Sequence, residues 1–341
     1  MKSVVAFRTH GGPKVGLGHV RRCLNLGREI VQKDKRLVFI LDEDLETLRL
    51  VQSYGFDAVT VKGNGGERRT LDIIDQYKPD IIVADSYELT SDQLSVFQSR
   101  ARLVVVDDLA DRYIPADIII NGSAHTKELI YKTRQDTLLL LGPQYLLLGS
   151  EFSNVPARLV KPEVERVLVT LGGGDAGHLT LRLVQWIEEA LKEVSIHVVV
   201  GPFFDQGLVK KLQTNRRVIL HMAPTSLQGL MLETDLAVSA GGHTAYELAA
   251  TGTPAILTLT AENQRGQVTA LEKIGVFCYA GETGQNNIIK TNLVSTLQRL
   301  VKNFDERRVM SKRGQQLVDG LGAHRVTQKI LDIVSHAKRE T

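Results

Sequence analysis

The sequence contains few of the residues on which several classes of protein depend. It has 2 cysteines, 1 tryptophan and 5 % aromatic residues in 341 positions. Cys23 and Cys278 lie far apart and form no C-x-x-C pair, which excludes a disulfide framework and a zinc site, and both are expected to be buried. The Asp42-Glu43-Asp44 segment sits where a helix begins, so it is interpreted as a helix cap and not as a metal motif. We therefore expect no metal and no cofactor.

The chain also lacks a strong net charge and a long apolar run. Its formal charge is +3, which gives no sign of the concentrated basic face that nucleic-acid binding needs. The most apolar stretch, residues 138–148, is interrupted by Gly142-Pro143 and falls short of the roughly 18 apolar residues of a membrane span. The N-terminus leads directly into a predicted strand without a signal-peptide pattern. We expect a cytoplasmic protein without a nucleic-acid partner or an integral membrane segment; the sequence leaves its oligomeric state open.

The most informative stretch is Val15 to Gly27, which follows the apolar run at residues 4–7. An apolar run, glycines and then a helical pattern predict a strand, a tight loop and a helix. Gly16 and Gly18 allow a tight turn and the close approach of a ligand to a helix N-terminus, which favours anions. His19 lies at the junction of loop and helix, and its imidazole can move a proton near neutral pH.

Short β-branched runs alternate with helical stretches along the whole chain, which predicts parallel sheets covered by helices. In the first half we expect strands at 37–41, 58–61, 80–84, 103–106 and 118–120, a first helix ending near residue 32, a glycine-rich loop at 63–67 and a helix at 71–77. Asp85 and Tyr87 follow one of these strands, at the edge where ligands bind in open α/β sheets. The alternative is that Asp85 caps the next turn and Tyr87 packs.

Prolines at 156 and 162 among charged residues suggest a linker near residues 150–162, after which the same pattern begins again. We expect an N-terminal Rossmann-like domain over 1–155, a second one over 162–322, and a C-terminal helix over 323–341 that can pack back on the first domain. Strands are expected at 167–171, 196–200, 218–221 and 236–239, and helices through 191, at 293–301 and at 326–337. Gly173 follows the first of these strands.

Residues 239–264 form the densest stretch of the second half. One strand is expected to end at Gly241-Gly242 before a helix that carries Thr244 and Glu247, and another strand is expected to end at Asn263-Gln264. Backbone N–H groups at the helix start and Thr244 can hold a diphosphate without a metal. Glu247 can accept hydrogen bonds from a ribose; the alternative is helix capping and a surface carboxylate.

Several motifs together resemble a known family. They are G-L-G-H-V-R-R-C-L-N-L from residue 16, D-S-Y at 85–87, V-V-D-D-L-A-D-R at 105–112, L-L-G-P-Q-Y at 140–145, A-G-G-H-T-A-Y-E from 240, and A-E-N-Q at 261–264. The chain resembles the pseudaminic-acid pathway hydrolases, a family that includes the spore-coat polysaccharide proteins called SpsG. Its second half also resembles the nucleotide-binding half of MurG-type glycosyltransferases. The resemblance covers most of the chain.

The resemblance implies a GT-B fold, with two doubly wound Rossmann-like domains that face each other across a cleft between Gly18 and Gly242. It also implies hydrolysis of a UDP-linked diacetamido-trideoxy-altrose, or a close relative, to UDP and the free sugar, with inversion at the anomeric carbon. His19 would be the catalytic residue, with Tyr87 beside it. The residues assigned to the substrate, from the glycine loops or from the resemblance, are Gly16, Gly18, Arg21, Asp85, Gly173, Gly241, Gly242, Thr244, Glu247, Asn263 and Gln264.

One feature departs from the family pattern. Members commonly show Arg-x-Asp near the end of the first strand, whereas this chain has Arg8-Thr9-His10, which leaves the identity of the sugar open. The main alternative is a GT-B glycosyltransferase that uses a UDP-sugar donor, because an acceptor hydroxyl can replace water in the same geometry. The others are a binding protein without turnover and a nicotinamide dehydrogenase, against which Arg21 stands in place of the third glycine of G-x-G-x-x-G. His19 can also be a helix-start residue only.

Overall fold

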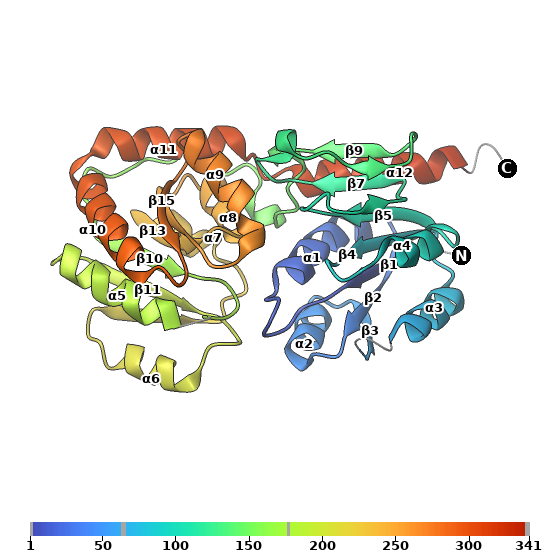
Figure 1. Ribbon diagram of the computed structural model, residues 1–341, viewed down its shortest axis with the longest axis horizontal. Helices are drawn as coiled ribbons and strands as arrows, with labels where there is room; N and C mark the ends of the chain where they lie inside the picture. Colours follow the sequence, from blue (N-terminus) through green and yellow to red (C-terminus); the bar gives the residue numbers. More distant parts are fainter. Residues whose placement is uncertain (1–2, 63–65, 176–177, 338–341) are drawn as a thin grey trace. The chain divides into compact units, whose positions relative to one another are not determined.

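The computed structural model describes residues 3–62, 66–175 and 178–337. The chain divides into two α/β units, each shown in Figure 1. Unit 1 comprises Met1–Ser150 and Gly320–Thr341, and unit 2 comprises Glu151–Asp319. The domain boundaries expected from the sequence were 155, 162 and 322, and the cleft expected between the domains stays a prediction.

Unit 1 is built on a seven-stranded parallel sheet with the order β3-β2-β1-β4-β5-β7-β9. Its strands are β1 Val4–Thr9, β2 Arg36–Asp42, β3 Asp57–Val61, β4 Ile81–Asp85, β5 Arg102–Val106, β7 Ile118–Asn121 and β9 Leu138–Leu141. Its helices are α1 Gly18–Val31, α2 Leu45–Ser53, α3 Gly66–Tyr77, α4 Ser91–Gln98 and α12 Gly322–Ala337. Two short strands, β6 Tyr113–Ile114 and β8 Lys132–Thr133, pair outside the sheet. Because the order reverses between β1 and β4, the carboxyl ends of these two strands mark the switch point at which such sheets bind ligands.

Helices cover both faces of this sheet because successive strand residues point to opposite faces. Phe7 of β1 packs in one apolar cluster with Leu24 of α1 and Val326 of α12. Its neighbour Ala6 packs in the other cluster, which includes Ile73 of α3. Although α12 is the last helix in the sequence, it belongs to unit 1 and packs against α1.

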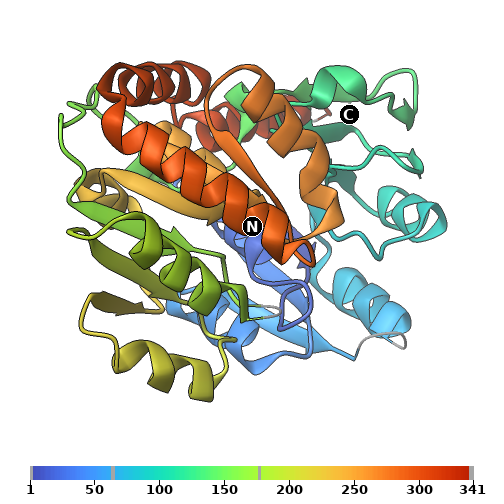
Figure 2. The same ribbon diagram turned by 60° about the vertical axis from the view of Figure 1, so that its left-hand side comes forward.

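Unit 2 repeats the architecture with a six-stranded parallel sheet of order β12-β11-β10-β13-β14-β15. Its strands are β10 Arg166–Thr170, β11 Ser195–Val200, β12 Val218–Met222, β13 Leu236–Ala240, β14 Ala255–Leu259 and β15 Cys278–Glu282. Its helices are α5 Leu179–Ala190, α6 Gln206–Gln213, α7 Gln228–Glu233, α8 His243–Ala250, α9 Arg265–Lys273, α10 Asn286–Lys302 and α11 Phe304–Leu317. In Figure 2, α5 (green) and α10 (red-orange) lie side by side over this sheet. The switch point of unit 2 lies between β10 and β13.

Four expectations about individual segments need correction. Asn263 and Gln264 do not follow a strand end: β14 stops at Leu259, and residues 262–264 form a 3₁₀ turn that the side chain of Gln264 closes by accepting a hydrogen bond from the Thr260 backbone at 3.1 Å. Cys278 is half-buried, because β15 is an edge strand. Asp44 alone caps α2, while Asp42 ends β2. The loop expected at 63–67 lies outside the described residues up to 65, and α3 already begins at Gly66.

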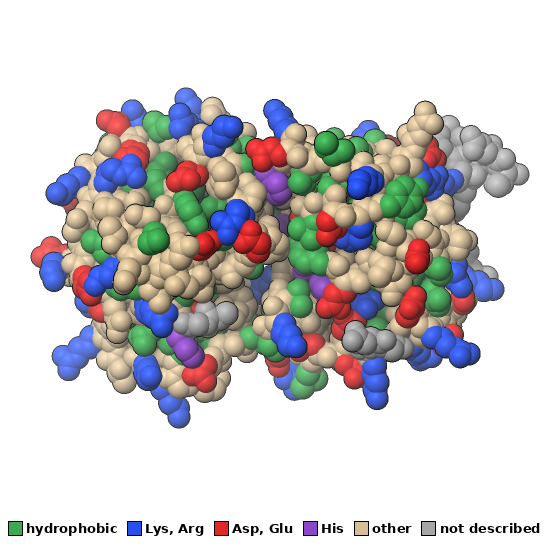
Figure 3. Space-filling model, in the orientation of Figure 1, with side chains coloured by type: hydrophobic (Ala, Val, Ile, Leu, Met, Phe, Trp, Pro, Cys, Tyr) green, Lys and Arg blue, Asp and Glu red, His purple; other side chains and the backbone are tan. Residues whose placement is uncertain are grey.

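Charged side chains of both signs are intermixed over the surface of each unit on the face shown in Figure 3. This distribution agrees with the small net charge of +3. Within the described ranges, no helix is both long and apolar enough to span a bilayer.

Candidate active site

The predicted catalytic loop lies at the switch point of unit 1. The loop from β1 turns back on itself through paired backbone hydrogen bonds between Gly12 and Gly16, and Gly16 has a φ of +77° that favours glycine. α1 then begins at Gly18, where an added Cβ would meet no atom within 4 Å. The position at Gly18 thus has free space beside the backbone, and its role in holding a ligand stays a prediction.

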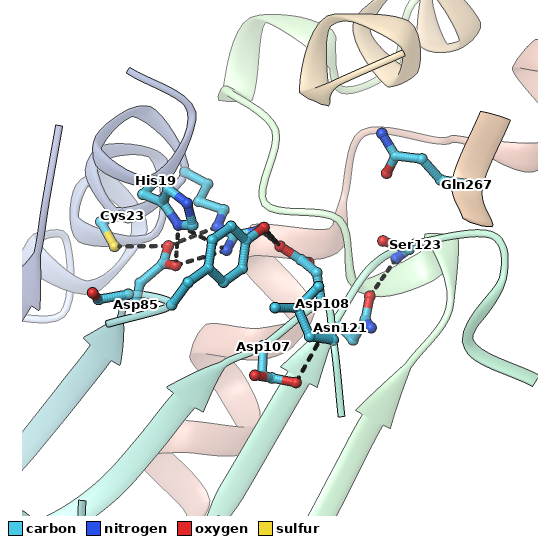
Figure 4. A network of polar contacts seen from close by, with 12 residues as sticks. His19, Cys23, Asp85, Asp107, Asp108, Asn121, Ser123 and Gln267 are labelled. Carbon is cyan, nitrogen blue, oxygen red and sulfur yellow. Dashed lines mark hydrogen bonds and ion pairs between the residues drawn. The ribbon is translucent and has the colours of Figure 1, made fainter. Parts of the chain in front are cut away.

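The structure brings His19 and Asp85 into direct contact. The Nδ1 atom of His19 lies 2.6 Å from Oδ1 of Asp85, although the two residues are 66 positions apart. Asp85 is fully buried at the end of β4, and His19 is 7 % exposed in the first turn of α1. Figure 4 shows His19 and Cys23 of α1 converging on this carboxylate. The strand order places them together, because β1, which leads into α1, pairs directly with β4.

The surrounding charges determine which nitrogen of His19 carries the proton. Burial alone would raise the pKa of Asp85, but the charges of Arg22 and His19 and their hydrogen bonds hold it well below its usual range. An ionised carboxylate only accepts hydrogen bonds, so at 2.6 Å His19 donates from Nδ1–H to Asp85. In the neutral ring, Nε2 then keeps its lone pair. This is the arrangement of a histidine oriented for general-base chemistry.

Arg22 and Asp108 complete the cluster. The Arg22 guanidinium donates to Asp85 from Nε and from Nη2, both at 2.6 Å, and to Asp108 from Nη1 at 2.7 Å. The hydroxyl of Tyr87 donates to the same Oδ2 of Asp108 at 2.7 Å. The Tyr87 ring stands edge-on to the His19 ring with 4.5 Å between centroids. Tyr87 thus lies beside His19, and its predicted place near the reacting centre stays a prediction.

A second histidine, His10, lies on the other side of His19, with 4.8 Å between ring centroids. It is 3 % exposed, and its Nδ1 lies 3.1 Å from Oγ of Ser86. Burial, followed by the effect of His19, lowers the pKa of His10 to about 4, so this ring is neutral near pH 7. His10, Asp42 and Glu88 bring possible metal-ligand atoms within 4.8 Å of one another. Asp42 is already paired with Arg8 at 2.5 Å, so the cluster already has a cation partner.

The predicted nucleotide-binding segment of unit 2 follows β13. Gly242 is the N-cap of α8, which carries Thr244 and Glu247 in its first two turns, both half-buried. An added Cβ on Gly241 would meet Val268 of α9 at 2.1 Å, so packing alone requires glycine there. At Gly242 the nearest atom to such a Cβ is 3.5 Å away, on a flexible glutamine side chain. Of the two glycines, Gly242 is therefore the one whose absent side chain leaves space.

Two other predicted residues of unit 2, Gly173 and Gln264, have local structural roles that the sequence did not reveal. Gly173, after β10, accepts a backbone hydrogen bond from Phe203 at 2.9 Å. Gly201 packs so closely that its Cβ would lie 2.4 Å from the Gly173 oxygen. The side chain of Gln264 is engaged in its own turn, and Asn263 beside it is exposed. Gly173 and Gly241–Gly242 nevertheless flank the switch point of unit 2.

From the sequence, Arg21 was expected to be a substrate-binding residue, and Arg22 and Asp108 were not identified as members of the site. In the structure it is Arg22, three residues after His19 and so on the same face of α1, that reaches the carboxylates. The position of Asp108 at the end of β5, beside β4, was the signal that could have identified it. Arg21 is partly exposed on the same helix.

No model of a known protein family matches the chain. An uncharacterized protein of Methanocaldococcus jannaschii is 24 % identical over 278 residues, 76 % of this chain and 56 % of that protein. A Helicobacter pylori protein is 27 % identical over 266 residues, 77 % of this chain and 45 % of that protein. Its name is pseudaminic acid cytidylyltransferase and UDP-2,4-diacetamido-2,4,6-trideoxy-beta-L-altropyranose hydrolase. The chain thus spans about half the length of these two relatives. The spore coat polysaccharide biosynthesis protein SpsG of Bacillus subtilis is 23 % identical over 340 residues, 96 % of this chain and 98 % of its own.

Solved structures agree on the fold. MurG of Acinetobacter baumannii superimposes with a TM-score of 0.68 at 13 % identity, covering 97 % of this chain and 100 % of its own. The calicheamicin glycosyltransferase CalG4 gives a TM-score of 0.67 at 12 % identity, covering 98 % of this chain and 99 % of its own. The predicted α/β fold of GT-B type is therefore confirmed. The chain is similar in sequence to the pseudaminic-acid pathway hydrolases and to SpsG, and it shares its fold with the GT-B glycosyltransferases.

Proposed function

We propose that this protein is an enzyme of surface-polysaccharide or nonulosonic-acid biosynthesis that hydrolyses a UDP-linked amino or deoxy sugar to the free sugar and UDP. The observation that carries the proposal is the buried His19–Asp85 pair, 2.6 Å apart at the switch point of unit 1. A histidine fixed by a carboxylate is a means of activating water. The name of the Helicobacter pylori relative supports the substrate class, and the name of the Bacillus subtilis relative supports a place in polysaccharide biosynthesis.

In the proposed reaction His19 acts as the general base. Its Nε2 accepts a proton from water as the water oxygen bonds to the anomeric carbon. The bond between that carbon and the phosphate oxygen breaks, and the electron pair leaves with UDP. Asp85 stabilises the imidazolium that forms, since its carboxylate already accepts the proton on Nδ1. Attack opposite to the leaving group inverts the anomeric carbon.

We further propose that unit 2 binds UDP through Gly242, Thr244 and Glu247. The start of α8 offers backbone N–H groups and a positive dipole end to the diphosphate, which needs no metal there. Glu247 would accept from the ribose hydroxyls. Tyr87, whose ring touches the edge of His19, would border the reacting sugar.

A glycosyltransferase is the second candidate, because an acceptor hydroxyl can take the place of water at the same site. In that reaction His19 would deprotonate an acceptor hydroxyl, and the same residues would serve. Water and acceptor therefore have to be distinguished by experiment.

The test is UDP release from a panel of UDP-sugars, measured by mass spectrometry with and without added acceptor hydroxyl compounds. We expect release of UDP and free sugar from at least one UDP-amino sugar without an acceptor. In H₂¹⁸O the released UDP should contain no ¹⁸O, because attack occurs at carbon and not at phosphorus. UDP release only with an acceptor would favour the transferase, and binding of UDP-sugars without any release would contradict both.

A further inference from the structure

Among the residues that the structure describes, Arg22 is the cation that joins Asp85 and Asp108. Its guanidinium donates to both oxygens of Asp85 and to Asp108, and its side chain is only 11 % exposed. Asp85 is 0 % exposed and the side chain of Asp108 is 15 % exposed. Two carboxylates this close, and largely removed from water, are costly unless a cation lies between them. Arg22 fills that position with the planar fork suited to two-point contacts.

The same guanidinium also acts on His19. Nη2 of Arg22 lies 3.1 Å from Nδ1 of His19, and both groups contact Oδ1 of Asp85 at 2.6 Å. With the proton on Nδ1, Nη2 and Nδ1 cannot donate to one another, and both donate to the ionised Asp85. With the proton on Nε2, Nδ1 would accept from Nη2 but would face the Asp85 oxygen at 2.6 Å with no proton between them. Arg22 therefore favours an ionised Asp85, which in turn favours the tautomer of His19 with the proton on Nδ1. On its other side, Arg22 fixes Asp108, which accepts a hydrogen bond from the hydroxyl of Tyr87 at 2.7 Å and so restrains the Tyr87 ring.

We propose that Arg22 is the positioning residue of this site: by clamping Asp85 and Asp108 it holds His19 as the Nδ1–H tautomer and Tyr87 against it. This proposal rests on the proposed function in assigning His19 as the base. Arg22 makes no bond to the reacting atoms in this scheme. It sets the proton location on His19 and the orientation of both rings before substrate binds.

The test compares the wild type with Arg22→Gln and Arg22→Lys by two independent measurements. The first is the ring ¹⁵N spectrum of histidine-labelled protein, in which His19 is assigned by its loss in His19→Asn; protonated and unprotonated ring nitrogens have well-separated shifts. The second is the separation of kcat from KM on the UDP-sugar that the wild type cleaves. Arg28→Gln, exposed on the same helix and stacked on Tyr54, is the matched control for loss of an arginine.

In the wild type and in Arg28→Gln we expect the proton of neutral His19 on Nδ1. In Arg22→Gln we expect a mixture of both tautomers, with kcat lowered about 10- to 100-fold, as for other partners that orient a functional histidine, and KM within about 3-fold. Arg22→Lys should lie between the two, because it keeps the charge but cannot bridge both carboxylates. If the tautomer and kcat do not change together in Arg22→Gln, the proposal is wrong.

The test remains decisive if the variant does not fold or if the proposed function fails. Should Arg22→Gln not fold, Arg22→Gln with Asp108→Asn removes one charge of each sign and is examined in its place, with the same expected spectrum. Should the wild type cleave no UDP-sugar, the proposed function fails, but the spectrum still decides on Arg22. An unchanged Nδ1–H tautomer in the variant would then overturn its positioning role.

Discussion

The two units share one topology and carry different chemistry at their switch points. In unit 1 the carboxyl ends of the strands carry a connected cluster in which His19 and Asp85 are buried and Arg22 and Asp108 are half-buried. In unit 2 the corresponding edge carries glycines after β10 and β13, together with the half-buried Thr244 and Glu247. The first arrangement can move a proton, and the second can offer backbone N–H groups to an anion. Under the proposed function, the same architecture would serve two tasks, which the site residues determine and the fold does not.

His19→Asn is the strongest test of this difference between unit 1 and unit 2. Asparagine keeps a polar side chain but removes the proton acceptor suited to pH 7, so turnover should fall about 10²-fold or more. UDP affinity should change by less than about 2-fold if unit 2 alone holds the nucleotide. Turnover is measured as UDP release and affinity by calorimetry. His324→Asn, exposed on α12 and paired with Glu29, serves as the control and should keep wild-type turnover. A His19→Asn variant with near-normal turnover would assign the residue to the helix start alone.

Asp85→Asn should have the next largest effect. The amide can still contact Nδ1 of His19 but no longer holds its proton, so kcat should fall about 10- to 100-fold with little change in KM. The matched control is Asp80→Asn just before the same strand β4, where Asp80 accepts from Ser3 and the Val4 backbone. Equal loss of activity in both variants would point to general destabilisation of β4 and against a role for Asp85 in the chemistry.

These two residues also show what the sequence could and could not predict. His19 and Asp85 were found because each follows a buried strand, and the carboxyl ends of parallel strands share one edge of the sheet. The same reasoning located the strands, since β-branched runs such as residues 103–106 can hardly be placed elsewhere in an α/β fold.

The pairing of Arg22 was not accessible in this way. A charged residue in an amphipathic helix is by default a solvated side chain, and only the side-by-side placement of β1, β4 and β5 brings two carboxylates under it. The prediction for Gln264 was wrong for a related reason. Its predicted strand end is a 3₁₀ turn that its own side chain closes, a local preference that no apolar periodicity records.

The next largest difference between the two units is expected in their stability at low pH. Burial would raise the pKa of Asp85 and of Asp108, but Arg22 lowers both pKa values below the usual range. Their stabilisation is therefore present above the unfolded pKa of about 3.9 and is lost as the pH falls below it. In unit 2 burial raises the pKa of Asp175. Protonation of this carboxyl in acid therefore favours the folded state of unit 2, the opposite of the effect in unit 1.

We therefore expect unit 1 to open first between about pH 4 and pH 2. Fluorescence of Trp186, the one tryptophan and a residue of α5, reports unit 2. Amide exchange in α1 reports unit 1. The raised pKa of Asp107, caused by burial, offsets part of the effect in unit 1. Loss of Trp186 fluorescence at a higher pH than loss of α1 protection would contradict the expected order.

Glu247→Ala tests the nucleotide-binding half of the comparison with a smaller effect. Loss of one charge-assisted acceptor for the ribose should weaken UDP binding by roughly 10-fold, about 1.4 kcal/mol, as measured by calorimetry. Glu189→Ala on α5, an exposed glutamate paired with Lys290, is the control and should bind UDP as the wild type does. Unchanged affinity in Glu247→Ala would make this residue a surface carboxylate and leave the diphosphate contacts to the backbone.

The smallest effect is expected from removing metal ions. If a helix start holds the diphosphate in unit 2 and a histidine activates the water in unit 1, exhaustive dialysis against EDTA should leave UDP release within about 2-fold of the untreated enzyme. The place to look for an exception is the cluster of His10, Asp42 and Glu88, whose possible ligand atoms lie within 4.8 Å of one another. Arg8, paired with Asp42 at 2.5 Å, already supplies a positive charge there, so no divalent cation is needed to balance it. Activity that disappears with EDTA, returns with Mg²⁺ or Mn²⁺ and is insensitive to EDTA in Asp42→Asn would reverse this assignment and place a metal beside His19.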